Sequence, residues 1–294
     1  MDNTKSIAFA SGKGGTGKTT LAVNFAKHLS MEKNIKVALY DLDVEEPNSL
    51  IYFPDADNIF QTILSVDIPS FDLSKCRFCG ICDSKCNFNA ISVFNNKLIF
   101  HKELCKSCQR CKYICPAGAI SFEDMKIGKA TIFEDRELTI FEGRLNEGKI
   151  QAKDLIRQVK NVSHHKTFDY KILDCPPGTT CPMVESVTNA DFVILVTEPT
   201  PFGLHDLSLA VEALAELKKR FAVIINKSDE NDVIIYDYCS AKYIDIITTI
   251  KFDINYAKIS SSGRLLASDE SGNADNYFSD KMSSISAYLS EADV

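Results

Sequence analysis

The stretch GKGGTGKT at residues 12–19 decides the fold of this chain. It fits G-x-x-x-x-G-K-[ST], a loop whose glycines let backbone N–H groups turn inward around phosphate oxygens. An apolar strand, Ile7–Ala10, precedes the loop, and a helical pattern with Leu21, Phe25 and Leu29 on one face follows it. Because the N-terminus of that helix adds positive potential, the segment predicts a nucleotide-phosphate site rather than a plain glycine turn.

The loop and the first turn of its helix supply the expected nucleotide contacts. Lys18 is expected to reach the β- and γ-phosphates, and the Thr19 hydroxyl is expected to ligate Mg²⁺. The predicted nucleotide-binding residues of this segment are Gly12, Gly14, Gly15, Thr16, Gly17, Lys18, Thr19 and Thr20.

Outside the loop, continuous apolar runs alternate with helical patterns. Strands are expected at 35–40, 171–174, 192–197, 222–226 and 245–250, and helices at 152–160 and 204–219. Apolar strands of this kind are typical of a parallel sheet covered on both faces. We therefore predict an α/β fold with a mostly parallel sheet and helices on both faces.

Three aspartates follow these strands. Asp41 and Asp43 lie in DLDVEEPN after the second strand, and Asp174 opens DCPPG after the strand that ends there. Since ligands of open α/β sheets bind at the carboxyl ends of strands, Asp41 and Asp174 are expected to join Thr19 around Mg²⁺. Capping of the following turn is the alternative role for Asp41 and Asp43.

The cysteines form a second signal. Eight of the eleven lie in two runs, C-x2-C-x2-C-x3-C, and the second run repeats the first after 29 residues. Bacterial ferredoxins use this spacing, with the fourth cysteine of each run ligating the other cluster. The spacing therefore predicts two 4Fe–4S clusters, and zinc is the alternative metal. The expected ligands are Cys76, Cys79, Cys82 and Cys115 for one cluster, and Cys86, Cys105, Cys108 and Cys111 for the other.

The cysteine runs divide the chain. We predict a P-loop domain made of residues 1–70 and 126–294, interrupted at 71–125 by a small α+β ferredoxin-like insert. Each half of the insert is too small to fold without its metal.

Composition narrows the class of protein. The 294 residues carry a net charge of −7, which disfavours nucleic acid as a partner, and 45% are apolar. No signal peptide or membrane-spanning run is recognisable, so the cysteines are not expected to form disulfides and a cytoplasmic location is expected. The C-terminal helical face, with Met282, Ile285, Tyr288 and Leu289, precedes an acidic end and predicts packing rather than a membrane anchor.

The stretch KGGTGKT resembles the deviant Walker A loop of the MinD/Mrp and nitrogenase iron-protein ATPases of the SIMIBI class. The resemblance implies a homodimer that sandwiches ATP, with Lys13 reaching the partner's nucleotide. It also implies that Asp43 orients the attacking water, which makes Lys13, Lys18 and Asp43 the expected catalytic residues. Asn226 is similar to the adenine-reading residue of the group, although Asn226–Asp229 (NKSD) also fits the guanine motif N-K-x-D.

Of the three remaining cysteines, only Cys181 lies near the expected mechanism. It follows Asp174 by seven positions and resembles the cluster-ligating cysteine of the nitrogenase iron protein. The resemblance implies a transient metal ligand, and a buried structural thiol is the alternative.

These expectations combine into an ATPase with ATP, Mg²⁺ and two 4Fe–4S clusters as cofactors. By family resemblance, the expected role is iron–sulfur cluster or metallocofactor assembly, with an apo iron–sulfur protein as partner. The alternatives are an ATP-gated electron donor to a redox enzyme and a redox-sensing, nucleotide-dependent organiser.

Overall fold

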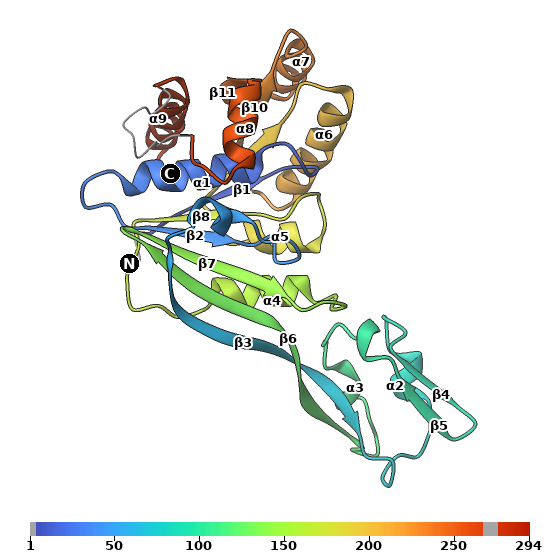
Figure 1. The fold of residues 1–294 in the computed structure, drawn as a ribbon. Helices are drawn as coiled ribbons and strands as arrows, with labels where there is room; N and C mark the ends of the chain where they lie inside the picture. Colours follow the sequence, from blue (N-terminus) through green and yellow to red (C-terminus); the bar gives the residue numbers. More distant parts are fainter. Residues whose placement is uncertain (1–3, 267–275) are drawn as a thin grey trace.

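The computed structural model describes residues 4–266 and 276–294, and its main body is a nine-stranded sheet between two layers of helices (Figure 1). The strand order is β11-β10-β9-β1-β8-β2-β7-β6-β3. The pairs from β11 to β7 are parallel, and β6 and β3 add to one edge as antiparallel strands. The predicted α/β sheet is therefore confirmed, with an antiparallel extension that the strand pattern did not predict.

The strands of this sheet are β1 (Lys5–Ala10), β2 (Val37–Asp41), β3 (Asp57–Phe71), β6 (Ile120–Asp135), β7 (Leu138–Leu145), β8 (Tyr170–Asp174), β9 (Phe192–Thr197), β10 (Phe221–Ser228) and β11 (Ile246–Lys251). The helices are α1 (Lys18–Ser30), α2 (Ile81–Ser84), α3 (Arg110–Tyr113), α4 (Ala152–Lys160), α5 (Cys181–Val187), α6 (Pro201–Glu216), α7 (Val233–Lys242), α8 (Ile254–Ser261) and α9 (Asn276–Glu291). Two short 3-10 turns, η1 (Ser49–Tyr52) and η2 (Lys102–Leu104), complete the described elements.

The core has one apolar cluster on each face of the sheet. Strand β1 shows why, because its successive side chains point to opposite faces. Ile7 and Phe9 pack with α1 and α9, whereas Ala8 and Ala10 pack with the helices of the other face. Residues of α4, α5 and α6 complete the cluster on that second face.

The C-terminal helix α9 packs as its sequence pattern predicts. Met282, Ile285 and Leu289 are buried against the sheet and α1. None of the helices in the described ranges combines the length and apolar character that crossing a membrane requires.

A long ribbon carries the cysteine-rich part of the chain. Strands β3 and β6 pair from Asp57↔Glu134 to Phe71↔Ile120, and their far half extends beyond the body of the protein (Figure 1). The cysteine lobe, residues 72–119, hangs on the end of this ribbon and contains α2, α3 and the hairpin β4 (Ile91–Phe94) and β5 (Lys97–Phe100). The predicted insert boundary at 125 falls inside β6, since the ribbon is continuous with the main sheet.

Candidate nucleotide site and cysteine lobe

The glycine loop forms the turn between β1 and α1. Gly15 and Gly17 have φ of 79° and 90°, a left-handed conformation that favours glycine. A Cβ on Gly17 would lie 2.2 Å from the Asn226 amide nitrogen, so close packing also excludes a side chain there. The turn holds the predicted loop residues Gly12, Gly14, Gly15, Thr16 and Gly17, and α1 begins directly after them at Lys18.

Lys18 lies in the middle of the predicted acidic residues. Its Nζ is 2.6 Å from Asp174 Oδ1 and 3.4 Å from Thr19 Oγ1. Burial alone would lower the pKa of Lys18, but the adjacent Asp174 carboxylate outweighs burial and the pKa is raised. The loop lysine therefore stays charged, and it is neutralised by the strand-end aspartate of β8.

Asp41 is fully buried at the end of β2. Its Oδ2 accepts hydrogen bonds from the backbone N–H of Asn48 and Ser49, at 2.9 and 2.8 Å. This is the capping role that the sequence left as the alternative for Asp41. Burial and the nearby Asp174 charge raise the pKa of Asp41 to about 7.

Asp43 completes a group of three carboxylates. Burial raises its pKa to about 6, with Lys18 opposing and Asp174 adding to the shift. Asp41, Asp43 and Asp174 thus lie near a single lysine, although the three carboxylates do not converge closely enough to hold one metal ion as they stand. Ser49, which the sequence reasoning missed, lies 3.5 Å from Asp174 through its hydroxyl and matches no recognisable motif.

One polar atom of the loop has no partner. The Thr16 hydroxyl is buried, and among the described residues no group accepts from it or donates to it. A buried hydroxyl without a partner is costly, so its position in a phosphate-type loop fits a bound oxyanion.

Lys13 is paired within its own chain. Its ammonium group forms an ion pair with the Glu198 carboxylate, and Lys227 Nζ reaches the other Glu198 oxygen at 3.1 Å. Lys227 also donates to the Gly15 carbonyl at 2.7 Å. Glu198 was missed by the sequence reasoning, although its position directly after the strand ending at Thr197 was a usable signal.

A cavity of about 230 Å³ opens beside the loop, and Asn226 lines it. Asn226 Nδ2 donates to the Thr16 carbonyl at 2.7 Å, so this residue also supports the loop. Tyr256 and Ser260 of α8 form the opposite wall, which no sequence motif had marked. Thr20, the last predicted loop contact, has its Oγ1 3.0 Å from Ser260 Oγ.

The segment after Asp174 holds two cysteines in contrasting environments. Cys175 is buried, and burial raises the pKa of its thiol to about 12. Cys181 is exposed at the first residue of α5, so it is not the buried structural thiol that was weighed for it. Gly178 N donates to the Ser11 carbonyl at 2.9 Å, which holds this segment against the glycine loop.

The two cysteine runs fold in the same way. Helices α2 and α3 are offset by the 29 residues of the repeat. Left-handed backbone recurs at matching positions of the repeat: Phe78 corresponds to Ser107, and Gly80 corresponds to Gln109. The sequence repeat is therefore also a structural repeat.

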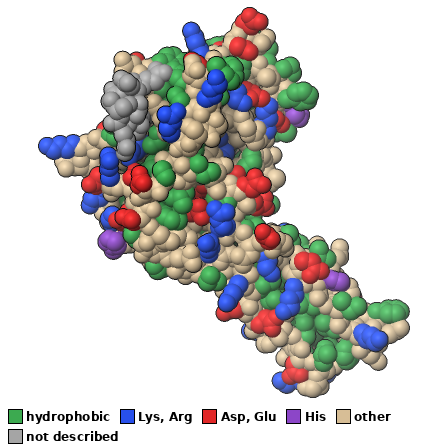
Figure 2. All heavy atoms as spheres, viewed as in Figure 1, with side chains coloured by type: hydrophobic (Ala, Val, Ile, Leu, Met, Phe, Trp, Pro, Cys, Tyr) green, Lys and Arg blue, Asp and Glu red, His purple; other side chains and the backbone are tan. Residues whose placement is uncertain are grey.

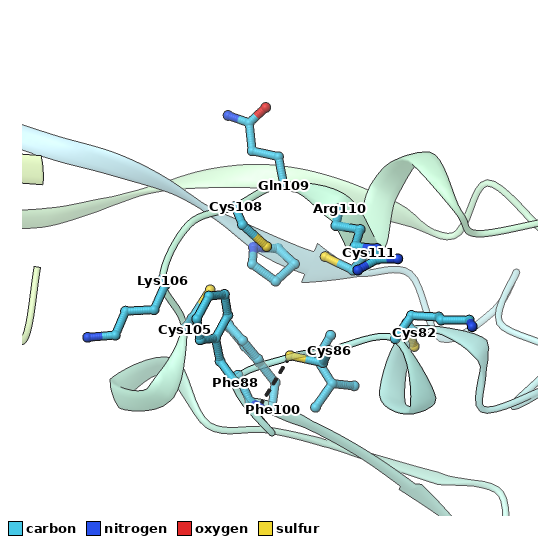
Figure 3. Close-up of a pocket in the computed structure, with 14 residues that line it drawn as sticks. Cys82, Cys86, Phe88, Phe100, Cys105, Lys106, Cys108, Gln109, Arg110 and Cys111 are labelled. Atoms are coloured by element: carbon cyan, nitrogen blue, oxygen red, sulfur yellow. Dashed lines mark hydrogen bonds between the residues drawn. The ribbon is translucent and has the colours of Figure 1, made fainter. Parts of the chain in front are cut away.

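The lobe contains two small cavities of about 20 Å³ each. We call the first the proximal cavity and the second the distal cavity. Cys86 lines the proximal cavity together with the first three cysteines of the second run (Figure 3). Cys115 lines the distal cavity with the first three cysteines of the first run. Cys82 lies at the edge of the proximal cavity as well, so the two cavities adjoin.

Backbone N–H groups point at four of the sulfurs. Each donor–sulfur distance is 3.4 Å, and the pattern repeats between the runs: Phe78 to Cys76, Ala90 to Cys86, Ser107 to Cys105 and Ala119 to Cys115. Such donors stabilise a thiolate. Burial acts in the opposite direction and raises the pKa of Cys111 to about 11.

The cysteine spacing predicts a four-cysteine ligand set for each 4Fe–4S cluster. Within the described ranges, no three Cys, His, Asp or Glu side chains converge closely enough to hold one metal ion. A 4Fe–4S cubane gives each thiolate a separate iron, so its four ligands surround a larger volume. Four cysteines line the distal cavity, and the proximal cavity is lined by its four predicted ligands and by Cys82.

The proximal cavity adjoins the main body. Gln151 Nε2 donates to the Cys105 carbonyl at 2.9 Å, and Gln151 is buried directly before α4. Cys105 itself belongs to the apolar core of the body. The loop of the second cysteine run thus contacts the segment that precedes α4 as well as the ribbon.

Two comparisons concern related sequences. An AAA domain family model matches residues 4–228. Two uncharacterized proteins of Methanocaldococcus jannaschii are similar to this chain. MJ0579 is 30% identical over 231 residues, 77% of this chain and 81% of that protein. MJ0578 is 31% identical over 266 residues, 90% and 91% of the two chains. An iron-sulfur cluster carrier protein of Rickettsia felis is 26% identical over 220 residues, 74% of this chain and 51% of that protein.

Solved structures agree on the fold. MinD of Pyrococcus furiosus superposes with a TM-score of 0.58 at 16% identity, covering 98% and 100% of the two chains. MinD of Pyrococcus horikoshii complexed with Mg-ADP gives 0.53 at 19% identity, covering 89% and 87%. A ParA family ATPase of Chlorobium tepidum gives 0.54 at 18% identity, covering 89% and 90%. Since the family model spans most of the chain, this protein belongs to the AAA domain family and has the fold of the MinD- and ParA-type P-loop ATPases.

Proposed function

We propose that this protein hydrolyses ATP, carries two 4Fe–4S clusters in its lobe and acts in iron–sulfur cluster or metallocofactor assembly. The observation that carries the proposal is the lining of the two lobe cavities. Each has three cysteines of one run and the fourth cysteine of the other, on a chain whose main body has a phosphate-type loop.

The nucleotide step uses residues that already lie together. Lys18 binds the β- and γ-phosphates in place of Asp174, and Asp174 turns to Mg²⁺ with Thr19 and Asp41. The magnesium ion, when bound, neutralises phosphate charge. Asp43 orients a water that attacks the γ-phosphorus, the bond to the β-phosphate oxygen breaks, and ADP and phosphate leave.

Lys13 acts from a second copy of the chain. Its positive charge reaches the transferred phosphoryl group across a homodimer interface, which requires its release from Glu198. The exposed glycines of the loop support this arrangement, because the face that holds Lys13 is open to a partner.

ATP is the nucleotide that the base pocket favours. In the N-K-x-D motif the aspartate reads guanine, but here Asp229 Oδ1 accepts a hydrogen bond from Asn231 N within its own turn. Asp229 is also absent from the lining of the 230 Å³ cavity, where Asn226 is present. An amide side chain can pair with the donor and acceptor edge of adenine.

The cluster ligands are those around each cavity. One cluster takes Cys76, Cys79, Cys82 and Cys115, and the other takes Cys86, Cys105, Cys108 and Cys111. When bound, the clusters supply one-electron chemistry or serve as transferable cargo. Such clusters need a reducing compartment, so we place the protein in the cytoplasm. Cys181, exposed next to the Asp174 segment, is a transient ligand for cargo in this scheme.

The assembly role rests on the iron-sulfur cluster carrier relative, and a second role has its own support. Cys82 borders both cavities, so two resident clusters would lie next to each other. Adjacent clusters suit electron passage, which favours an ATP-gated electron donor as the second candidate.

Anaerobic purification with iron, sulfide and ATPase measurements tests the proposal. We expect about eight irons per chain from two cubanes, and ATPase activity that Lys18→Ala abolishes. Iron that moves to an apo-ferredoxin on ATP addition supports assembly. Iron that stays while a dye acceptor is reduced supports electron delivery. Iron-free protein, or equal ATPase activity in wild type and Lys18→Ala, contradicts the proposal.

A further inference from the structure

The cysteine lobe differs in charge from the rest of the chain. Residues 72–119 contain eight Lys or Arg against three Asp or Glu, a balance of +5. The whole chain carries −7, so the remaining residues carry −12. Positive charge is thus concentrated on a lobe that a ribbon carries at one end of the acidic body (Figure 1).

The three acids of the lobe are already engaged. Asp72 pairs with Lys75 at 2.9 Å, and Asp83 Oδ2 accepts from Val93 N at 2.8 Å. Glu103 lies 3.4 Å from His101. Most basic side chains of the lobe, by contrast, have no ion pair with any described residue. The acids of the lobe therefore do not neutralise these basic side chains, and the two proposed clusters, whose thiolates are anionic, would offset only part of their charge.

Three of these basic residues surround the proximal cavity. Lys85, Lys106 and Arg110 line it and are exposed, and Figure 3 shows Lys106 and Arg110 on either side of the cysteines. We call these three residues the basic rim. Phe88, which is 39% exposed, lies in the same lining. Figure 2 shows an apolar area next to Lys and Arg side chains on the visible face of the lobe.

We propose that the basic rim docks an acidic electron-carrier protein, which delivers an electron to the cluster held by Cys86, Cys105, Cys108 and Cys111. An apolar centre within a charged border is the usual anatomy of a transient interface. The proposal rests on the proposed clusters. One electron leaves the reduced flavin or iron–sulfur centre of the carrier and enters the oxidised cluster, and no bond forms or breaks.

A purely local role for the rim is the competing explanation. A cubane with four thiolates is anionic, so nearby cations also offset its charge. Charges that only offset a cluster gain from burial, whereas the rim residues are exposed, where salt screens them. The two roles differ in what a substitution changes, because local compensation shifts the cluster potential and docking changes the rate of association.

The test uses anaerobic holoprotein and a photoreduced acidic flavodoxin as the carrier. Stopped-flow reduction of the clusters is followed at increasing ionic strength. The rim variant is Lys85→Glu, Lys106→Glu, Arg110→Glu. The matched control makes the same charge change on exposed residues of the body, Lys33→Glu, Lys218→Glu, Lys242→Glu. Reduction by photoreduced deazaflavin, a small reductant without a docking face, reports the clusters themselves.

We expect the wild-type rate to fall with salt, and the rim variant to react about tenfold more slowly than the control at low salt. Deazaflavin should reduce all three proteins alike. A salt-independent wild-type rate, a rim variant equal to the control, or a duplex oligonucleotide that binds the rim without the carrier doing so overturns the docking proposal. Iron-free protein overturns the parent proposal with it, whereas loaded clusters with an unaffected rate overturn docking alone.

Discussion

Lys18 Nζ and Asp174 Oδ1 form a buried ion pair at 2.6 Å, which joins the first residue of α1 to the last residue of β8. The two residues are 156 positions apart, and their side chains are 7% and 0% exposed. Asp174 therefore holds the Lys18 ammonium group at the phosphate-binding loop. Lys18 must break this ion pair when it binds the nucleotide phosphates.

Removing one partner of this pair should cost stability as well as activity. Lys18→Ala leaves Asp174 buried and unpaired, so we expect the free energy of unfolding to fall by about 3 kcal/mol. Lys18→Met with Asp174→Leu should recover most of that loss but no ATPase activity. Urea unfolding of the single and double variants checks this, and additive losses in the double variant would contradict the coupling.

The pH dependence of stability should report the crowded carboxylates. The pKa of Asp41 is raised from 3.8 to about 7, so folding favours its protonated form. Its contribution to stability is complete below 3.8 and is lost as pH rises through about 7. We expect Asp41→Asn to flatten this fall in the nucleotide-free protein, measured by urea unfolding across that range.

The affinity of the site for Mg²⁺ with nucleotide should also depend on pH. Mg²⁺ with nucleotide needs ionised carboxylates, so its affinity should rise with pH through about 6, where Asp43 titrates, to about 7, where Asp41 titrates. Isothermal titration of Mg-ATP at several pH values measures this, with Asp229→Asn as a control outside the site. A flat affinity profile would show that these carboxylates do not face the metal.

Glu198 should restrain ATP-dependent dimerisation. Glu198→Gln frees Lys13 from its intrachain ion pair, so we expect dimerisation with a non-hydrolysable ATP analogue at a several-fold lower protein concentration. The effect is modest, because Lys13 is 30% exposed and such pairs contribute about 1 kcal/mol or less. Analytical ultracentrifugation measures the shift.

Lys227→Met is the matched control for that experiment. It removes the second cation from Glu198 and leaves the Lys13 pair in place. Dimerisation that responds to Lys227→Met as strongly as to Glu198→Gln would assign the effect to loop support rather than to Lys13.

Pairs of cysteine substitutions should reveal which residues share a cluster. Cys76 and Cys115 line one cavity. The iron lost in Cys76→Ala and the iron lost in Cys115→Ala should therefore not add in the double variant. Cys105→Ala lines the other cavity, and its loss should add to that of Cys115→Ala. Iron counts and electron paramagnetic resonance on anaerobic protein distinguish these outcomes, and the reverse pattern would reassign the fourth ligands.

The sequence predicted the elements whose signal is local. The strand at 192–197 and the helix at 152–160 lie where their periodicity placed them, because both depend on neighbouring residues. The antiparallel ribbon was not predicted, since β3 and β6 pair across 48 intervening residues and neither strand alternates cleanly along its length. The α8 wall of the base pocket was not predicted either, because its residues lie far in sequence from the loop that they face and match no motif.

By itself the sequence determined the phosphate loop and the cysteine spacing. Both depend on the backbone geometry of a few neighbouring residues, so both can be recognised without the rest of the fold. Only the tertiary structure decided that Lys13 meets Glu198, 185 residues away, and that Gln151 joins the Cys105 loop to the body. Those contacts join residues that are far apart in the sequence and come together only when the sheet forms. Burial and charge then determine which side chains pair, and no local sequence pattern records that pairing.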